Sequence, residues 1–346
     1  MDPHSRRSAT GTRPPVENVL VTVPYSDSEI DQLVELFRPA NVIRARKDDD
    51  EAIARALEVA DLAVIEGDLD SRFLSGSRLQ WVHCDHSGLN KTARPEVFDS
   101  GIVVTGAAGR SAPTLAQHVF YFALALTHDA PGLLEMQRQK RWRGLSDYST
   151  RLSLWGKTLG IIGMGRTGEE VASLGRAFGM TVLGHRRSAA EPGVPVDRMY
   201  SVENGDTIDE LLTDSDVVVL TAKLTDETRH MIGEEQLKLM KRSAYLINIA
   251  RGPLIDEDAL VDALDGGVIA GAGLDVFEQE PLPEDARIWS ARNVLITPHV
   301  TPAMPNRTQR SIDIVTENYR RFQSDEPMLN LLTPADAYSH TPGDAT

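Results

Sequence analysis

The chain has 346 residues with 51 acidic and 36 basic side chains, a formal net charge of −15 and a hydrophobic fraction of 41%. This length and apolar content allow two domains with sizeable cores. An acidic surface repels phosphate backbones, so the balance of charge argues against a nucleic acid as the main partner.

The cysteine content and the apolar runs narrow the class of protein further. Cys84 is the only cysteine, which rules out an intrachain disulfide and fits the reducing cytoplasm, where we expect the protein to act. The longest apolar run, residues 119–126, is far shorter than the roughly 20 residues of a membrane helix and predicts a buried helix instead. Residues 1–17 lack the apolar core of a secretory signal. We expect a disordered tail there, with a transit peptide as the less favoured alternative.

Short apolar runs alternate with polar or helical segments through the first hundred residues. The segment 27–37 has helical spacing at Ile30, Leu33 and Phe37. Four runs have the length and composition of strands: 18–23, 62–66, 79–84 and 101–106. This alternation is typical of a parallel sheet in an α/β domain.

A second series of the same kind begins near Leu159. Its strand-like runs are 159–163, 181–185, 217–222, 244–249, 270–276 and 293–298. Residues 256–264 have acidic residues in the first turn and apolar residues at helical spacing. Thr207 and Glu210 match a capping box and predict a further helix start. The apolar helix around residues 119–126 separates the two series, so we expect two sheets.

The first run of the second series leads into a G-x-G-x-x-G motif formed by Gly163, Gly165 and Gly168. The motif follows a strand and opens a helix that stops at Gly179, which is the context that a dinucleotide-binding turn requires. Glycines there permit a tight turn and a close approach of pyrophosphate to backbone N–H groups. The alternative is a glycine-rich turn without a ligand.

The residues after the next strand indicate which dinucleotide is bound. NAD sites place an acidic residue about 20 positions after the glycines, where it accepts hydrogen bonds from the ribose 2′-OH. This chain has Arg186, Arg187 and Ser188 there, and no acidic residue between Met180 and Ala190. Two guanidinium groups suit a 2′-phosphate, so we expect NADP(H), with NAD(H) use through dual specificity as the alternative.

Three chemically useful residues follow the last strands of the series. Arg251, Glu280 and His299 each lie just beyond a strand, at the sheet edge where ligands bind in open α/β folds. Alone, the arginine would more often make a surface salt bridge and the histidine would more often be structural. Together they suit the reduction of a 2-oxo acid: arginine binds the carboxylate, histidine gives a proton to the carbonyl oxygen, and glutamate orients the histidine.

With these motifs the sequence resembles the D-isomer-specific 2-hydroxyacid dehydrogenases, from about Asn18 to Leu332. The resemblance rests on G-M-G-R-T-G, N-I-A-R-G, G-L-D-V-F-E-Q-E-P and T-P-H in that order. It implies two Rossmann-like lobes with parallel sheets, an active site in the cleft between them, and a homodimer. It also implies a substrate domain over 18–110 and 303–335, a dinucleotide-binding domain over 111–302, and tails at 1–17 and 336–346.

The resemblance also assigns roles to individual residues. Arg251, Glu280 and His299 become the catalytic triad. The residues expected to contact the cofactor, besides the glycines and residues 186–188, are Arg166, Thr167, Ala250 and Asp275. Backbone N–H groups of Ser87, Gly88 and Leu89 are expected to bind the substrate carboxylate.

Residues 83–86 invite a different interpretation, because His83, Cys84, Asp85 and His86 are all potential metal ligands. Their spacing matches no common zinc pattern and a second cysteine is lacking, so we expect no metal. His86, Asn90, Lys223 and the pair Thr301-Pro302 depart from the family pattern, which predicts an unusual substrate.

The sequence therefore predicts an NAD(P)-dependent oxidoreductase that acts on a D-2-hydroxy acid or its 2-oxo acid, a small carboxylate. Oxidation of an inorganic acid such as phosphite is an alternative within enzymes; Glu280 argues against formate. A dinucleotide-sensing binding module, similar to corepressors related to this family, is the alternative outside enzymes. Turnover on a panel of 2-oxo acids separates these classes.

Overall fold

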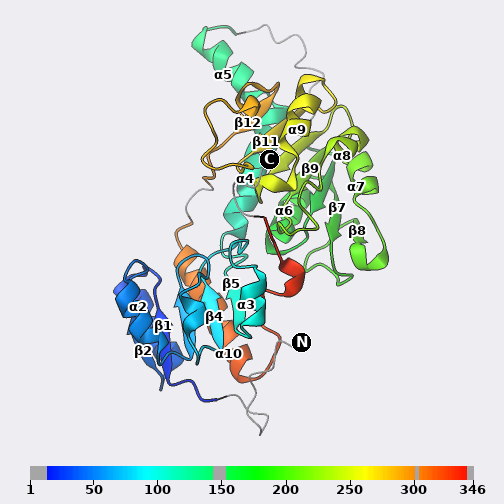
Figure 1. Cartoon of the computed structure of the whole chain (residues 1–346). Helices are drawn as coiled ribbons and strands as arrows, with labels where there is room; N and C mark the ends of the chain where they lie inside the picture. The colour runs from blue at the N-terminus through cyan, green and yellow to red at the C-terminus, as the bar shows by residue number, and fades with distance from the viewer. Residues whose placement is uncertain (1–13, 143–152, 301–303, 341–346) are drawn as a thin grey trace. The chain divides into compact units, whose positions relative to one another are not determined.

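The computed structural model describes residues 14–142, 153–300 and 304–340 (Figure 1). The chain divides into two compact units, one of Met1–Arg110 with Met304–Thr346 and one of Ser111–Ala303. We call them unit 1 and unit 2 and describe each by itself. Most of the predicted tail at 1–17 lies outside the described residues, and so does the whole pair Thr301-Pro302.

Unit 1 contains a five-stranded sheet in the order β2-β1-β3-β4-β5, in which every pairing is parallel. Its strands are β1 (Asn18–Val21), β2 (Asn41–Arg44), β3 (Leu62–Ile65), β4 (Trp81–Cys84) and β5 (Val103–Gly106). Parallel strands run in the same direction, so the loops after β1, β3 and β4 all leave the sheet at one edge.

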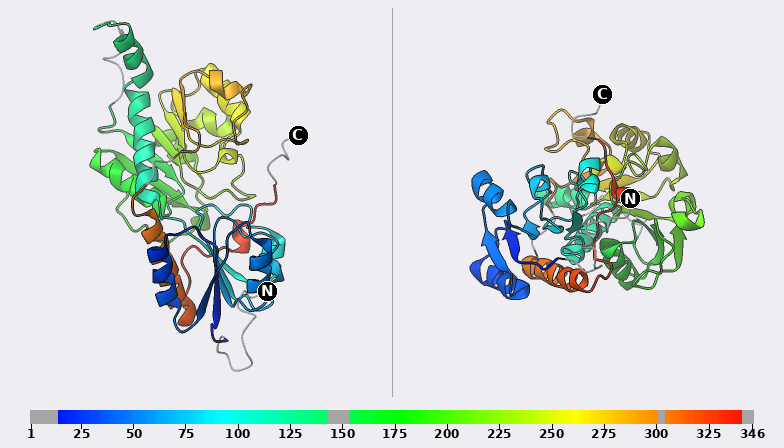
Figure 2. Two further views of the ribbon diagram at one scale, coloured as in Figure 1. Left: turned by 90° about the vertical axis from the view of Figure 1, so that its left-hand side faces the viewer. Right: turned by 60° about the horizontal axis from the view of Figure 1, so that its bottom comes forward.

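Alternating side chains of these strands fill two cores, one on each face of the sheet. On one face, α1 (Asp27–Phe37) packs with α10 (Arg307–Gln323), which comes from the far end of the chain (Figure 2). The other face carries α2 (Asp50–Leu57), α3 (Pro95–Asp99) and the short helix η1 (Phe73–Ser75). Because α10 packs on this sheet, unit 1 is made of two separate segments of the chain. The short helix η6 (Pro334–Asp336) follows α10.

Unit 2 contains a seven-stranded parallel sheet in the order β12-β11-β10-β9-β6-β7-β8. The strands are β6 (Thr158–Ile162), β7 (Thr181–Arg186), β8 (Arg198–Ser201), β9 (Val217–Leu220), β10 (Tyr245–Asn248), β11 (Gly271–Leu274) and β12 (Val294–Ile296). The chain starts in the middle at β6, proceeds outward to β8, and returns to the other side of β6 at β9. The order therefore reverses between β6 and β9, the point where ligands bind in doubly wound α/β sheets.

Helices cover both faces of this second sheet (Figures 1 and 2). The helices of unit 2 are α4 (Ala112–Thr127), α5 (Ala130–Arg138), which extends away from the sheet, α6 (Arg166–Ala177), α7 (Asp209–Asp214), α8 (Glu234–Leu239) and α9 (Glu257–Asp265), with the short helices η3 (Val202–Asn204), η4 (Gly252–Leu254) and η5 (Arg287–Ser290). The buried side of α4, which includes Val119 and Phe122, packs with α6 against β6 and β9. This confirms the buried helix predicted around residues 119–126.

One local prediction differs from the structure. The helix predicted at Thr207 begins later than expected, since α7 starts at Asp209 with Ile208 as N-cap, and Thr207 Oγ1 only accepts the Asp209 N–H at 3.3 Å. The capping box at Thr207 and Glu210 was therefore wrong. In the described part of the chain, no helix combines the length and apolar character needed to cross a membrane.

Candidate active site

The three glycines of the G-x-G-x-x-G motif have three different surroundings. Gly163 follows β6 with φ +109°, and a Cβ there would lie 2.3 Å from the Ala222 nitrogen. A Cβ on Gly168, in the first turn of α6, would lie 2.5 Å from the Gly163 carbonyl oxygen. A Cβ on Gly165, the N-cap of α6, would meet nothing within 4 Å. The first and third glycines are thus required by packing, whereas the second borders open space.

This turn has the features of a pyrophosphate cradle. Gly165 is exposed, and the N-terminus of the 12-residue helix α6 begins beside it at Arg166 and Thr167. The first N–H groups of a helix have no partner within the helix and carry partial positive charge, so an anion fits there. Gly163 and Met164 both donate their N–H to the carbonyl oxygen of His185, at 2.8 and 3.0 Å, which fixes the turn on the end of β7.

The same contacts bring the predicted ribose-binding residues next to the turn. Arg186 ends β7, directly after His185, and its Nη1 donates to the Ala190 carbonyl at 3.3 Å. Arg187 is exposed and Ser188 is half-buried. Sequence reasoning missed Glu203 of η3, whose carboxylate accepts the Ala189 N–H at 2.9 Å and thus places a negative charge near this loop.

Arg251 follows β10 on a loop with a defined shape. The buried Asn248 side chain accepts the Ala250 N–H at 3.0 Å and donates to the Arg251 carbonyl at 2.8 Å. The next residue, Gly252, approaches the backbone of Phe277 so closely that a Cβ would lie 1.8 Å from the Phe277 carbonyl carbon. The Arg251 loop and the loop that carries Glu280 therefore touch through backbone, and Asn248 is a positioning residue that the sequence motifs did not reveal.

Glu280 and His299 form a direct pair. Glu280 Oε2 lies 2.7 Å from His299 Nδ1, and Glu280 Oε1 accepts the Phe277 N–H at 3.0 Å. Burial alone would raise the pKa of Glu280, but the hydrogen bonds from His299 and Phe277 and the charges of His299 and Arg251 hold it below its usual value. The ionised Glu280 raises the pKa of His299, in opposition to partial burial and the Arg251 charge. The histidine is thus prepared to carry a proton near neutral pH.

Asp275 anchors the turn on which His299 lies. It follows β11 and is buried, and its Oδ1 accepts the Thr297 hydroxyl at 2.5 Å and the Val300 N–H at 2.9 Å. His299 itself has φ +53° and donates its N–H to the Thr297 carbonyl at 3.0 Å. Asp275 therefore fixes the residues on both sides of His299.

A second histidine–carboxylate pair lies beside this site. His230 Nε2 and Glu278 Oε1 are 2.6 Å apart. The backbone N–H of His230 donates to the Pro253 carbonyl at 2.8 Å. His230 thereby links the loops that carry Arg251 and Glu280. The sequence motifs did not reveal this pair.

In unit 1, the predicted carboxylate-binding loop follows β4. His86 Nδ1 contacts the Gly88 carbonyl at 2.8 Å, and Ser87 donates to the Ala107 carbonyl at 3.3 Å. Asp85, directly before this loop, forms a buried ion pair with Arg110 and accepts the Ser311 hydroxyl at 2.7 Å. Cys84 is buried and its thiol pKa is raised by burial. Among the described residues no group of three or more His, Cys, Asp or Glu side chains is placed to hold a metal.

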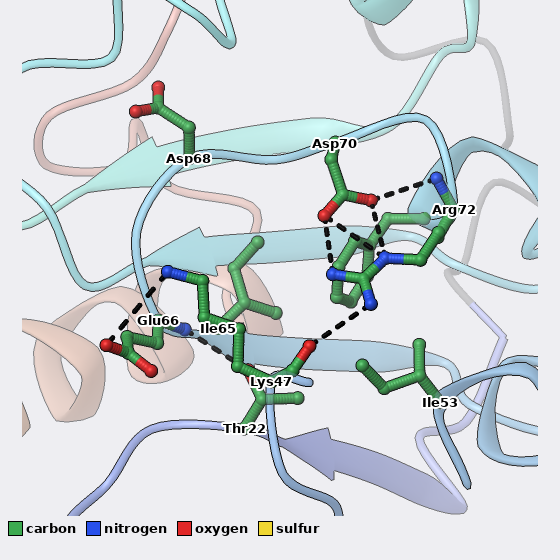
Figure 3. A pocket seen from close by; sticks show the side chains of 9 residues that line it. Thr22, Lys47, Ile53, Ile65, Glu66, Asp68, Asp70 and Arg72 are labelled. Carbon is green, nitrogen blue, oxygen red and sulfur yellow. Dashed lines mark hydrogen bonds and ion pairs between the residues drawn. The ribbon is translucent and has the colours of Figure 1, made fainter. Parts of the chain in front are cut away.

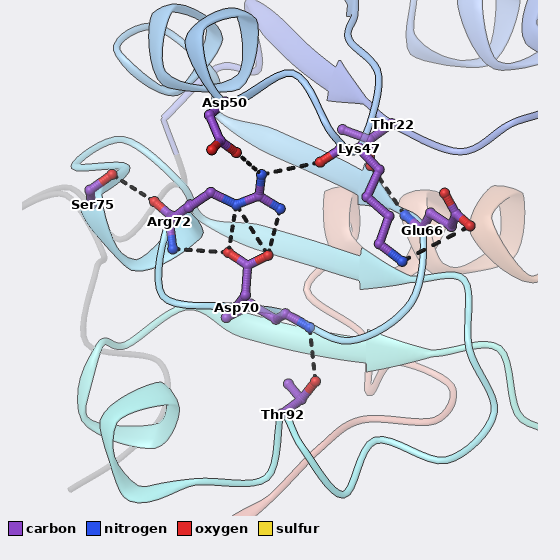
Figure 4. A network of polar contacts seen from close by, with 9 residues as sticks. Thr22, Lys47, Asp50, Glu66, Asp70, Arg72, Ser75 and Thr92 are labelled. Atoms are coloured by element: carbon purple, nitrogen blue, oxygen red, sulfur yellow. Dashed lines mark hydrogen bonds and ion pairs between the residues drawn. The ribbon is translucent and has the colours of Figure 1, made fainter. Parts of the chain in front are cut away.

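Other polar residues gather at the same edge of the unit 1 sheet (Figure 3). A small pocket there is lined by Thr22, Lys47, Ile53, Ile65, Glu66, Asp68, Asp70, Arg72 and Phe73. Arg72 binds Asp70 and Asp50, while Lys47 Nζ lies 4.0 Å from Glu66 (Figure 4). The arginine network fastens the loop after β3 onto the loop after β2.

Comparison with known proteins gives consistent results. Residues 120–301 match the model of the D-isomer specific 2-hydroxyacid dehydrogenase, NAD binding domain. A glyoxylate reductase of Korarchaeum cryptofilum is 38% identical over 253 residues, which are 72% of this chain and 74% of that protein. A glyoxylate reductase of Thermococcus kodakarensis is 31% identical over 333 residues, or 94% and 98% of the two chains. The solved structure of a D-isomer specific 2-hydroxyacid dehydrogenase from Xanthobacter autotrophicus Py2, in complex with NADPH and MES, has a TM-score of 0.75 and 28% identity and covers 93% of this chain and 99% of its own.

Proposed function

The chain belongs to the D-isomer-specific 2-hydroxyacid dehydrogenase family, and we propose that it reduces glyoxylate or a similarly small 2-oxo acid with NADPH. Membership makes it an NAD(P)-dependent oxidoreductase that transfers hydride between a 2-hydroxy acid and a 2-oxo acid. The choice of substrate is supported by relatives named glyoxylate reductase. The observation that carries the proposal is the Glu280–His299 pair, which shares its strand-end edge with Arg251.

Each proposed role follows from the charge and position of a side chain. When bound, the reduced nicotinamide supplies a hydride to the carbonyl carbon. The Arg251 guanidinium binds the substrate carboxylate in two parallel hydrogen bonds and orients the carbonyl. His299 keeps Nδ1 on Glu280, so its Nε2 donates the proton to the carbonyl oxygen. Backbone N–H groups of Ser87, Gly88 and Leu89 in unit 1 provide the second carboxylate contact, and unit 1 is the substrate domain of the proposal.

The proposed cofactor site uses the residues around the glycine turn. Arg166 and Thr167 lie at the start of α6 and would contact the pyrophosphate, and Ala250 and Asp275 would contact the nicotinamide end. Arg186, Arg187 and Ser188 would bind the 2′-phosphate, because they follow the strand whose His185 carbonyl holds the glycine turn. Glu203 weakens the local positive charge, but its carboxylate is engaged by the Ala189 N–H.

We also propose a homodimer in the cytoplasm as the functional form. The helix α5 has no buried residue and projects from the body of unit 2 (Figures 1 and 2). It exposes Leu134 at 54%, and Tyr121 on the neighbouring helix α4 is 56% exposed. A second copy of the chain would cover these apolar side chains, and sedimentation measurements at several concentrations test this.

The decisive experiment measures kcat/KM for a panel of 2-oxo acids with both NADPH and NADH. The proposal expects glyoxylate among the best substrates and a preference for NADPH. Phosphite oxidation with no 2-oxo acid reduction would support an inorganic acid as substrate instead. Tight dinucleotide binding without any turnover would support a sensing module.

A further inference from the structure

The buried histidine of α4 belongs to a hydrogen-bonded chain that ends at the turn carrying the proposed proton donor, His299. His118 is 5% exposed, and its Nε2 lies 3.1 Å from the Thr297 hydroxyl oxygen. Thr297 in turn lies 2.5 Å from Asp275 Oδ1. The three residues come from α4, from the loop after β12 and from the loop after β11. The contact therefore joins segments that are 179 and 22 positions apart in the sequence.

The direction of each hydrogen bond in this chain follows from chemistry. An ionised Asp275 can only accept, so the Thr297 hydroxyl donates its proton to Asp275 Oδ1. The Thr297 oxygen is then free to accept, and His118 must donate from Nε2. His118 is therefore the neutral tautomer with its hydrogen on Nε2, and its Nδ1 carries a lone pair that is buried without a partner. Burial lowers the pKa of His118, which keeps the ring neutral.

Packing fixes the ring in the orientation that this hydrogen bond requires. The imidazole stacks on Phe122, one helical turn further along α4, with ring centroids 4.8 Å apart and an interplanar angle of 17°. Phe122 is fully buried, and its ring occupies the space where a side chain on Gly273 of β11 would stand. The His118 donor is thus held by the hydrophobic contact of α4 with β11.

At its other end, the chain of contacts controls the turn around His299. Asp275 Oδ1 accepts the Val300 N–H as well as the Thr297 hydroxyl, and the Thr297 carbonyl accepts the His299 N–H. One carboxylate oxygen therefore fixes the residues before and after His299. A rotation of Asp275 would release both contacts at once.

We propose that His118 is a positioning residue for the reaction: through Thr297 it holds the Asp275 carboxylate in the orientation that fixes the His299 turn. This inference rests on the proposed role of His299 as proton donor. The alternative is that His118 only stabilises the packing of α4, in which case its loss would lower thermal stability and leave the properties of His299 unchanged.

The test compares His118→Phe with His118→Gln. Phenylalanine keeps an aromatic ring on Phe122 but removes the donor, whereas the Gln side-chain amide places a donor close to the position of His Nε2. We expect His118→Phe to lower kcat/KM about tenfold, a usual size for the loss of one buried hydrogen bond, and His118→Gln to recover most of it. The pKa of His299 should fall in His118→Phe, because a looser turn weakens its hydrogen bond to Glu280. The other charged groups that act on His299, Arg251 and Asp275, are unchanged in both variants.

A double-mutant cycle with Thr297→Val tests the route of the effect. If His118 acts through the Thr297 hydroxyl, His118→Phe should change kcat/KM by less than about twofold once Thr297 is valine. A full additional tenfold loss in that background would overturn the proposal. So would a His118→Phe enzyme with reduced thermal stability but wild-type kcat/KM and wild-type pH profile.

Titration of the His299 ring by NMR separates this proposal from the proposed function. The titration needs no turnover, so it remains informative if the panel of 2-oxo acids gives no activity. An unchanged His299 pKa in His118→Phe overturns the positioning role even if the wild-type enzyme is active. A lowered pKa that Gln restores supports the role even if the substrate has been assigned wrongly.

Discussion

Glu280 divides its carboxylate between two partners: Oε2 lies 2.7 Å from Nδ1 of His299, while Oε1 accepts the N–H of Phe277 on its own loop. The backbone contact prevents the carboxylate from rotating away, so the imidazole has one favoured orientation. That orientation engages Nδ1 and leaves Nε2 for a substrate oxygen.

Replacement of His299 by alanine should remove the proton donor and little else. We expect kcat to fall by roughly 10²–10⁴-fold, the usual contribution of a positioned acid, with nearly unchanged affinity for NADPH. Steady-state kinetics with the best 2-oxo acid and fluorescence titration of the cofactor measure the two quantities. A variant that keeps a near wild-type rate would exclude His299 from catalysis.

Glu280→Gln should move the pH profile of reduction. Reduction needs protonated His299, so kcat/KM falls as pH rises through the pKa of that residue. The Glu280 carboxylate raises this pKa, and a neutral amide removes the effect, so the alkaline limb should shift to lower pH. In the oxidation direction the acidic limb should shift the same way. Identical profiles for variant and wild type would contradict the pairing.

Arg251→Lys should weaken substrate binding while the fold is kept. Lysine has the same charge but cannot make two parallel hydrogen bonds to a carboxylate. We expect a higher KM for the 2-oxo acid and a kcat/KM lowered by about tenfold or more. Arg292→Lys, an exposed arginine on the loop before β12, is the matched control. An unchanged KM would show that Arg251 does not bind the carboxylate.

Arg186→Asp should reverse the cofactor preference. One charge-assisted hydrogen bond to the 2′-phosphate contributes about 1.5–3 kcal/mol. Its loss and the new negative charge should lower kcat/KM with NADPH by about tenfold to a hundredfold or more. Glu203→Gln is the counterpart, because it removes the nearby negative charge and should strengthen the preference for NADPH. A wild-type enzyme that favours NADH, or an Arg186→Asp variant with undiminished NADPH preference, would refute the assignment.

The buried His83 should make the protein sensitive to acid. It is fully buried on β4, its Nδ1 is 3.0 Å from Thr105 Oγ1, and burial lowers its pKa from 6.5 to about 4. The unfolded chain binds a proton at His83 more readily than the folded protein does. Above pH 6.5 both states have neutral His83, and the free energy of unfolding falls as the pH drops from there toward 4. The free energy of unfolding should be lower by about 2 kcal/mol at pH 5. Thermal melts from pH 7 to 5 should show a flatter curve for His83→Leu; parallel curves would contradict the prediction.

The interior strands of both sheets could be predicted from sequence because they are continuous apolar runs. Two edge strands, β5 and β12, are apolar and were predicted, whereas the edge strands β2 (NVIR) and β8 (RMYS) were missed because polar and charged residues interrupt their apolar runs. Apolar run length therefore finds strands with apolar side chains on both faces, and misses strands that carry charged residues.

The site shows a similar division. Arg251, Glu280 and His299 were found because each directly follows a strand in a motif. Asn248, Thr297 and His118 were missed as positioning residues because their importance depends on which side chains face them. Gly252 closes the N-I-A-R-G motif, but only the position of the Phe277 backbone shows why no side chain fits there. Contacts between distant loops of this kind leave no local pattern in the sequence.

The division of the chain into two units has a consequence for engineering. The glycine turn, Arg251, Glu280 and His299 all lie in unit 2, whereas the loop Ser87–Leu89 and the polar residues at the strand ends of β1 to β3 lie in unit 1. Two crossings, after Arg110 and before Met304, delimit the exchangeable part. Because unit 1 is the proposed substrate domain, we expect a chimaera that takes both of its segments from a relative to shift toward that relative's substrate range, which kcat/KM on the panel of 2-oxo acids measures. Asp85, Arg110 and Ser311 would have to be transplanted together, because their buried contacts link the two segments.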